Sequence, residues 1–104
     1  MYFVYILLSH QDHQFYIGYT QDIHRRFKEH NIGNNASTKN RRPLVLLYYE
    51  YHLNKQDALR RESYFKTTKG KSTLRQMLRL SLIDHFVAEV SEVSRIGTSG
   101  RGSG

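Results

Sequence analysis

Residues 15–31 change their hydrophobic period halfway along, and this change constrains the fold more than any other feature of the chain. The first six of them alternate between apolar and other side chains, which is the period of a β-strand. The rest have helical spacing, because Ile23 and Phe27 lie four residues apart, and both Thr20 and Asp22 are good N-cap residues. The segment therefore predicts a strand that leads directly into a helix.

Two side chains on this predicted helix are suited to an anion. Arg26 lies three residues after Ile23, and His30 lies one turn after Arg26, so the two are neighbours beside the apolar face. A guanidinium matches two phosphate oxygens, and an imidazole, with a pKa of about 6.5, accepts a proton near neutral pH. The alternatives are a salt bridge from Arg26 to Asp22 or Glu29 and an ordinary surface histidine.

The first strand of the sheet is predicted over residues 2–8, and it forms an antiparallel hairpin with the strand over 14–20. If the register is symmetric about the turn, Tyr5 shares a sheet face with Tyr16 or Gly18. Gly18 allows another group to approach the backbone closely. A tyrosine hydroxyl has a pKa of about 10 and needs a nearby cation to act as a base. The alternative is that both tyrosines are amphipathic core residues.

The remaining elements complete a fold of the α/β (α+β) class. Residues 44–51 form an apolar run that indicates a third strand, central in the sheet and covered on both faces. Asn54 or Asp57 would cap the second helix, and residues 67–71 would end it. The predicted helices cover about 22–31, 55–67, 72–80 and 81–93. We expect one domain over residues 1–93 and a flexible Gly/Ser-rich tail over 94–104.

Glu62 is an acidic residue in a basic part of the sequence. Residues 55–79 contain eight Lys or Arg residues and two acids, and Asp57 is explained by its position near a helix N-terminus. Glu62 lies four residues after Ala58 and three before Phe65, on an apolar stripe. A carboxylate there would bind a divalent cation such as Mg²⁺. The alternative is an ion pair with Lys66 at i, i+4.

The charge balance favours a polyanionic partner, first of all nucleic acid. The chain has 16 Lys and Arg residues against 9 acidic residues, a net charge of +7. It has no cysteine, which excludes a disulfide framework and fits the cytoplasm. The apolar N-terminus is too short to span a membrane. The side chains expected to line a track for the nucleic-acid backbone are Lys39, Arg41, Arg42, Lys66, Lys69 and Lys71.

The order of these residues resembles the GIY-YIG endonuclease superfamily, in particular its small stand-alone bacterial members. The resemblance covers about residues 2–79 and rests on Phe3-Val4-Tyr5, Tyr16-Ile17-Gly18, Arg26, His30 and Glu62. It implies a three-stranded antiparallel sheet flanked by helices, and phosphodiester hydrolysis with one divalent ion, Mg²⁺ or Mn²⁺, on Glu62. Phe3 stands where the first motif has glycine, and the asparagine of some members has no counterpart near Leu74.

The resemblance also implies a role for each site residue. Tyr5 or Tyr16, with its proton drawn toward His30, would orient or deprotonate the attacking water. Arg26 would neutralise the transition state, and the ion on Glu62 would stabilise the leaving oxygen. The expected activity is structure-preferring or non-specific cleavage of DNA in repair or recombination, with any preference coming from DNA shape or from a partner protein. The alternatives are an inactive nucleic-acid-binding module of the same fold and a domain that binds an acidic protein.

Overall fold

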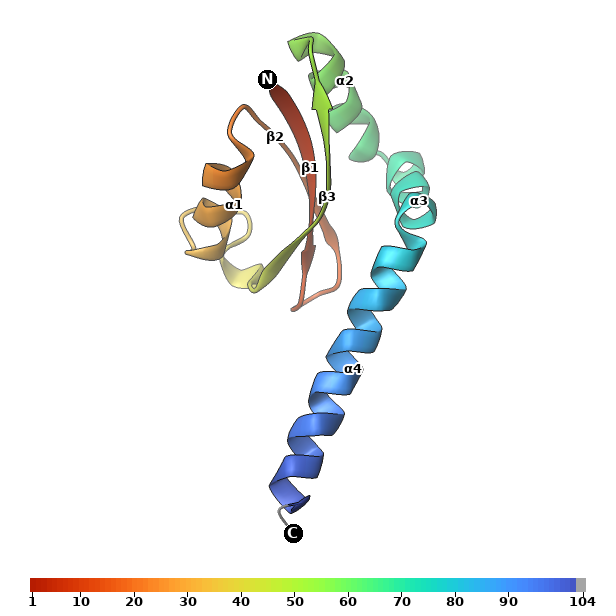
Figure 1. Ribbon diagram of the computed structural model, residues 1–104. Coiled ribbons are helices and arrows are strands. Elements are labelled where there is room, and N and C mark those ends of the chain that lie inside the picture. Colours follow the sequence, from red (N-terminus) through yellow and green to blue (C-terminus); the bar gives the residue numbers. More distant parts are fainter. Residues whose placement is uncertain (103–104) are drawn as a thin grey trace. The chain divides into compact units, whose positions relative to one another are not determined.

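A three-stranded antiparallel sheet organises the first part of the chain (Figure 1). The computed structural model describes the backbone of residues 1–102 and the side chains of residues 1–91. These residues form two compact units, Met1–Leu74 and Arg75–Gly104, and each is described by itself. The elements in chain order are β1 (Tyr2–Ser9), β2 (Phe15–Thr20), α1 (Ile23–Asn31), the 3-10 helix η1 (Lys39–Arg41), β3 (Leu44–His52), α2 (Lys55–Phe65), α3 (Thr68–Met77) and α4 (Arg79–Gly102).

The strand order is β2-β1-β3, so β1 is the central strand and the prediction that the third strand is central was wrong. From Val4 to Ser9 every residue of β1 is buried, whereas Tyr49 and Tyr51 of β3 are about half exposed. Both strands are apolar runs, so hydrophobicity alone does not separate them. The tyrosines of β3 are the difference from β1, because a tyrosine side chain can lie on a face of the sheet that is exposed to water.

The register of the β1–β2 hairpin is symmetric about the turn, which is the condition on which the shared tyrosine face depended. Tyr5 pairs with Gly18 and Leu7 pairs with Tyr16. Because side chains alternate between the faces of a strand, Tyr5, Gly18 and Tyr16 share one face of the sheet. The Ser9 side chain orders the turn, where its Oγ accepts hydrogen bonds from the backbone N–H groups of Gln11 and Asp12. The hairpin thus brings the two tyrosine motifs together.

Helices α1 and α2 cover opposite faces of the sheet (Figure 1). On one face, Ile23 and Phe27 of α1 pack on a core that includes Tyr5 and Leu7. The other face carries the alternate residues of β1, and α2 packs there through Ala58 and Phe65, which are fully buried. In α2, Arg61 donates to the Glu50 carboxylate of β3 over 2.7 Å. Each helix therefore buries one apolar stripe, as helical spacing predicts.

Side-chain caps begin both α1 and α2. Asp22 caps α1 by accepting a hydrogen bond from the N–H of Arg25, and Asn54 caps α2 through the N–H groups of Gln56 and Asp57. Helix α2 ends at Phe65, two residues before the predicted limit.

The expected break over residues 67–71 was largely wrong, because α3 begins at Thr68 instead of at residue 72. The Thr67 hydroxyl accepts a hydrogen bond from Gly70 N–H over 2.9 Å and so supplies the start of a helix. Gly70 itself packs closely against the backbone carbonyl of Tyr64. Glycine favours a break in an isolated helix, but here Gly70 allows the start of α3 to lie close to the end of α2.

The second unit contains α4, which includes the helix expected over 81–93. The expected tail over 94–104 stays a prediction, because side chains from residue 92 onward and all of residues 103–104 lie outside the described residues. The expected domain limit at residue 93 likewise stays a prediction. In the part of the chain that the structure describes, no helix has both the length and the apolar character needed to cross a bilayer.

Candidate active site

The ring of Tyr5 lies directly over Gly18 on the face of the sheet that α1 covers. A Cβ added to Gly18 would lie 2.3 Å from both Cζ and the hydroxyl oxygen of Tyr5, closer than any real contact. The close approach that glycine was expected to permit is therefore made by a tyrosine of the neighbouring strand. Gly18 is required at this position because it leaves room for that ring.

Tyr5 begins a chain of polar contacts that runs into the interior. Its hydroxyl lies 2.9 Å from Nε2 of His30, and Nδ1 of His30 lies 2.7 Å from Oγ1 of Thr38. Tyr5 is 2% exposed, and His30 and Thr38 are fully buried. The Tyr16 ring completes the group, with its centroid 4.9 Å from that of His30 and 6.3 Å from that of Tyr5.

The end of α1 holds His30 in the core, so the surface histidine considered as an alternative is not what the structure contains. Gly33 has a φ of +87°, the left-handed conformation that glycine adopts readily. The N–H of Gly33 donates to the carbonyl of His30, and the N–H of Asn34 donates to that of Glu29. These two bonds form the Schellman pattern, which ends the helix shortly after His30.

Arg26 lies one turn before His30 and has a polar atom without a partner. Its Nε is buried and, among the described residues, has no hydrogen-bond acceptor. The terminal nitrogen Nη1 lies 3.7 Å from Glu29, in a loose pair whose side chains are both about one-third exposed. Of the two salt-bridge alternatives, the structure contains the one to Glu29. A buried N–H with no acceptor costs free energy, so this atom is suited to an incoming anion.

Glu62 belongs to α2, and its carboxylate lies 3.2 Å from Nζ of Lys66. The i, i+4 ion pair considered from the sequence is therefore present. The Glu62 side chain is 18% exposed and that of Lys66 is 55% exposed. Burial is the main cause that raises the pKa of Tyr5, and the charge of Glu62 adds to it.

The electrostatics of the site keep both central groups neutral. Burial raises the pKa of Tyr5, the charges of Tyr16, Glu62 and Glu29 raise it further, and the guanidinium of Arg26 opposes them. Burial also lowers the pKa of His30 below its usual 6.5, and Arg26 lowers it further while Glu29 opposes this change. A neutral phenol and a neutral imidazole are thus in contact at neutral pH.

The donor set fits a hard divalent cation. Mg²⁺ binds through one or two carboxylates together with waters and substrate phosphate oxygens. The Glu62 side chain is 18% exposed and supplies one carboxylate, and the buried Nε of Arg26, which has no acceptor among the described residues, is a donor suited to a phosphate. The chemistry of the Glu62 carboxylate therefore fits one such ion.

Of the six basic residues expected to bind nucleic acid, three make polar contacts with other described residues and three are exposed lysines. Arg41 donates to Asp12 over 2.9 Å and to backbone carbonyls of β2 and its turn, and Arg42 donates to the carbonyls of Lys39 and Asn31. These guanidinium groups therefore join loops to one another. Lys66 pairs with Glu62. The remaining three are exposed side chains on η1 and α3, namely Lys39, Lys69 and Lys71.

Two further features were not read from the sequence. Thr38 lies in a polar loop with no periodicity, and its contact with His30 depends on how that loop folds back. On the opposite face of the sheet, the Glu50 carboxylate accepts hydrogen bonds from Arg61 and Tyr48 and lies 3.2 Å from His52. These contacts outweigh burial and lower the pKa of Glu50. Neither residue carries a spacing signal that would have identified it.

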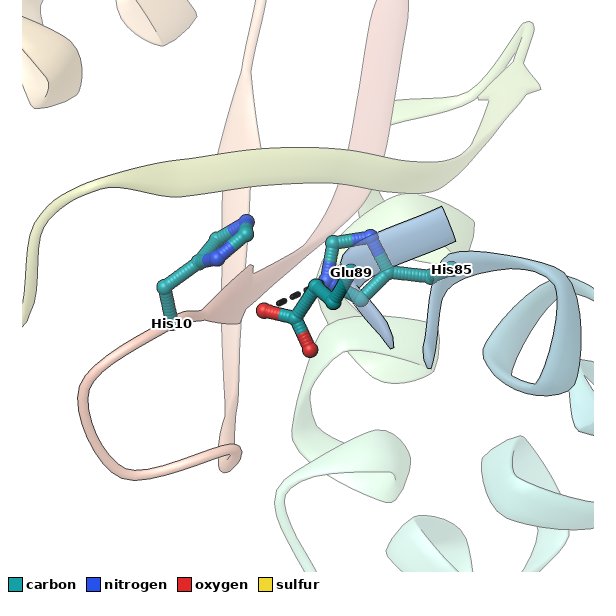
Figure 2. A group of neighbouring side chains, drawn as sticks. All are labelled: His10, His85 and Glu89. Carbon is teal, nitrogen blue, oxygen red and sulfur yellow. Dashed lines mark ion pairs between the residues drawn. The ribbon is translucent and has the colours of Figure 1, made fainter. Parts of the chain in front are cut away.

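In the second unit, His85 and Glu89 lie one turn apart on α4, as Figure 2 shows. Their Nε2 and Oε1 atoms are 3.7 Å apart, a distance at which they form an ion pair when His85 is protonated. Figure 2 also draws His10, which follows β1 in the first unit. The α4 pair has the ordinary i, i+4 geometry of a helix surface.

Comparison with known proteins identifies a family over the first unit. The family model described as "GIY-YIG catalytic domain" matches residues 1–76. The UPF0213 protein YazA of Bacillus subtilis is 44% identical over 62 residues, which are 59% of this chain and 63% of that protein. A UPF0213 protein of Staphylococcus haemolyticus is 40% identical over 76 residues, covering 72% of this chain and 92% of the relative. The solution NMR structure of a UPF0213 protein of Bacillus halodurans matches with a TM-score of 0.49 and 34% identity over 74% of this chain and 85% of the other.

Proposed function

The chain belongs to the GIY-YIG catalytic domain family, and from this premise we propose that it is a metal-dependent endonuclease that hydrolyses phosphodiester bonds in DNA. Membership of this family implies a nuclease-type function in general. The finer proposal is structure-preferring or non-specific cleavage, in repair or recombination. The observation that carries it is the buried Tyr5–His30 contact next to an Arg26 Nε that has no acceptor among the described residues.

Arg26 is the group proposed to bind the scissile phosphate. Its side chain extends from α1, and its buried Nε–H would donate a charge-assisted hydrogen bond to a phosphate oxygen. Hydrolysis places additional negative charge on the non-bridging oxygens in the transition state. A guanidinium at this position would stabilise that charge.

Tyr5 and Tyr16 are proposed to orient the attacking water. Their rings lie 6.3 Å apart on one sheet face, with His30 in contact with both. The hydroxyl of Tyr5 is fixed by His30, so it is a rigid hydrogen-bonding group for a water or a phosphate oxygen. The fully buried His30 contributes through that contact and does not meet the solvent itself.

Glu62 would hold one Mg²⁺ or Mn²⁺, whose chemistry there is Lewis-acid stabilisation of the leaving 3′ oxygen. Lys39, Lys69 and Lys71 would bind the nucleic-acid backbone in a sequence-independent and salt-dependent manner. A partner protein would supply any further specificity. A cytoplasmic location stays a prediction.

Cleavage assays on the purified chain test this proposal. Supercoiled, branched and single-stranded DNA are incubated with Mg²⁺ or Mn²⁺ and, in parallel, with EDTA. We expect metal-dependent nicking of the wild type that is lost in Glu62→Ala and in Arg26→Ala. Nicking that persists in both variants would contradict the proposal.

The second candidate function is a nucleic-acid-binding module without cleavage. Two observations favour it: Phe3 occupies the glycine position of the first motif, and Glu62 is already paired with Lys66. DNA binding by the wild type with no nicking in either metal would select this function. If the chain neither binds nor cleaves nucleic acid, the acidic-protein partner considered from the sequence would replace both.

A further inference from the structure

The two buried hydrogen bonds of His30 can run in either of two directions, because a neutral imidazole has one N–H donor and one lone pair that accepts. Nε2 faces the hydroxyl of Tyr5 and Nδ1 faces the hydroxyl of Thr38. Either Nδ1–H donates to Thr38 and Tyr5 donates to Nε2, or Thr38 donates to Nδ1 and Nε2–H donates to Tyr5. The two arrangements place the one unused hydroxyl proton at opposite ends of the chain of contacts.

In the first arrangement the unused proton belongs to Thr38. Thr38 is fully buried in the loop behind α1, and among the described residues His30 is the one hydrogen-bond partner of its hydroxyl. An O–H group buried without an acceptor is costly, whereas an unused lone pair on the same oxygen is tolerated. Thr38 is therefore better satisfied as the donor to Nδ1.

In the second arrangement the unused proton belongs to Tyr5, at the other end. The Tyr5 oxygen lies over Gly18, and the Tyr5 ring neighbours that of Tyr16, which is partly exposed. Tyr5 is 2% exposed, and in the proposed function a phosphate oxygen or a water at this end is the acceptor for its proton. Burial keeps Tyr5 protonated at neutral pH, because it raises the pKa of the phenol.

We propose that Thr38 is a positioning residue that donates to Nδ1 of His30, so that Nε2–H donates to Tyr5 and the Tyr5 O–H points into the site as a donor. This inference rests on the proposed nuclease function of the site. It reverses the direction expected from the sequence, in which His30 draws a proton from the tyrosine. Each hydrogen bond in the row Thr38–His30–Tyr5 is then donated toward the substrate, and Tyr5 orients a phosphate oxygen or the attacking water.

Nitrogen NMR of histidine tests the direction without reference to activity. The full chain is labelled with ¹⁵N-histidine, and His30 is assigned by its loss in His30→Gln. At neutral pH we expect Nε2 to be the protonated nitrogen and Nδ1 the unprotonated one. Thr38→Val, which keeps the shape and removes the hydroxyl, should shift the Nδ1 resonance, and Thr38→Ser should restore it. A protonated Nδ1, or an Nδ1 resonance that Thr38→Val leaves unmoved, overturns the inference.

Cleavage rates separate this inference from the function on which it rests. We expect Thr38→Val to lower kcat about tenfold with little change in KM, Thr38→Ser to stay within about twofold, and the exposed neighbour Ser37→Ala to match the wild type. Thermal unfolding of each variant shows whether it is folded. Absent cleavage with a protonated Nε2 contradicts the function and leaves the direction standing. Cleavage with a protonated Nδ1 does the reverse.

Discussion

The ring of Tyr5 occupies the space where any side chain at position 18 would have to lie, at 2.3 Å from its Cβ. Tyr5 and Gly18 are direct partners in the β1–β2 register, so the contact follows from the hairpin itself. The same ring position brings the hydroxyl within 2.9 Å of His30. The absence of a side chain at Gly18 thus allows Tyr5, a candidate catalytic residue of the other motif, to reach His30.

Gly18→Ala should displace the Tyr5 ring and break its contact with His30. We expect a loss of about 1–3 kcal/mol in the free energy of unfolding, typical of overpacking. Urea denaturation measures it. If the ring is the cause, the cost of Gly18→Ala should be much smaller in a Tyr5→Leu background, because the two changes share one contact. An equal cost in both backgrounds would argue against the clash.

Arg26→Lys should lower the cleavage rate at least about 100-fold, because an ammonium lacks the planar donors that bind two phosphate oxygens. The stability of the fold should change little, since the pair with Glu29 is loose and partly exposed. Arg25→Lys is the matched control, because Arg25 is more exposed and pairs with the same Glu29 at 4.0 Å. Equal rates for the two variants would remove Arg26 from the reaction.

Glu62→Gln should lower the rate of metal-dependent cleavage by about 10²–10³-fold, whereas Lys66→Ala should leave that rate largely unchanged. The two variants break the same 3.2 Å ion pair from opposite ends. If the carboxylate serves only that pair, both should behave alike, with a change of a few tenths of a kcal/mol in stability and none in rate. Titration with Mg²⁺, before and after EDTA, measures the difference.

Folding stability should fall as the pH decreases below about 6.5, because burial and Arg26 lower the pKa of His30 in the folded chain. In this range the unfolded state binds the proton more readily, so acid favours unfolding. The lowered pKa of Asp12 and of Glu50 acts in a more acidic range, below about 4.5, so the two effects are separable. Urea denaturation between pH 7.5 and 5, compared with His30→Gln, measures the slope. The same slope in both proteins would exclude His30 as its source.

Arg41→Gln and Lys39→Gln should have different effects although both remove one positive charge. Arg41 holds Asp12 and two backbone carbonyls, so its loss should lower stability by about 1 kcal/mol. Lys39 is exposed, so its loss should weaken DNA binding and reduce the slope of affinity against salt by about one. Fluorescence anisotropy over a range of salt, with unfolding curves for each variant, distinguishes them. A reduced salt slope for Arg41→Gln at unchanged stability would contradict this division.

Local patterns predicted most of the first unit. The alternation over 15–20 depends on neighbours in sequence and was found as expected, and Asp22 and Asn54, each one of two candidate caps, are the caps observed. The position of β3 was predicted wrongly, because two apolar runs of similar length compete for the centre of the sheet. The start of α3 was also misread, since the role of Gly70 depends on a carbonyl from the preceding helix.

For the site, the sequence by itself placed two tyrosines on one sheet face and Arg26 and His30 on one helix, because strand and helix periods are local properties. Only the tertiary structure decided that His30 is fully buried, that Thr38 contacts its far nitrogen and that Nε of Arg26 has no acceptor among the described residues. These features depend on how a loop without periodicity returns to α1. The free energy of burying a polar group depends on its partners in space, and no spacing in the chain encodes them.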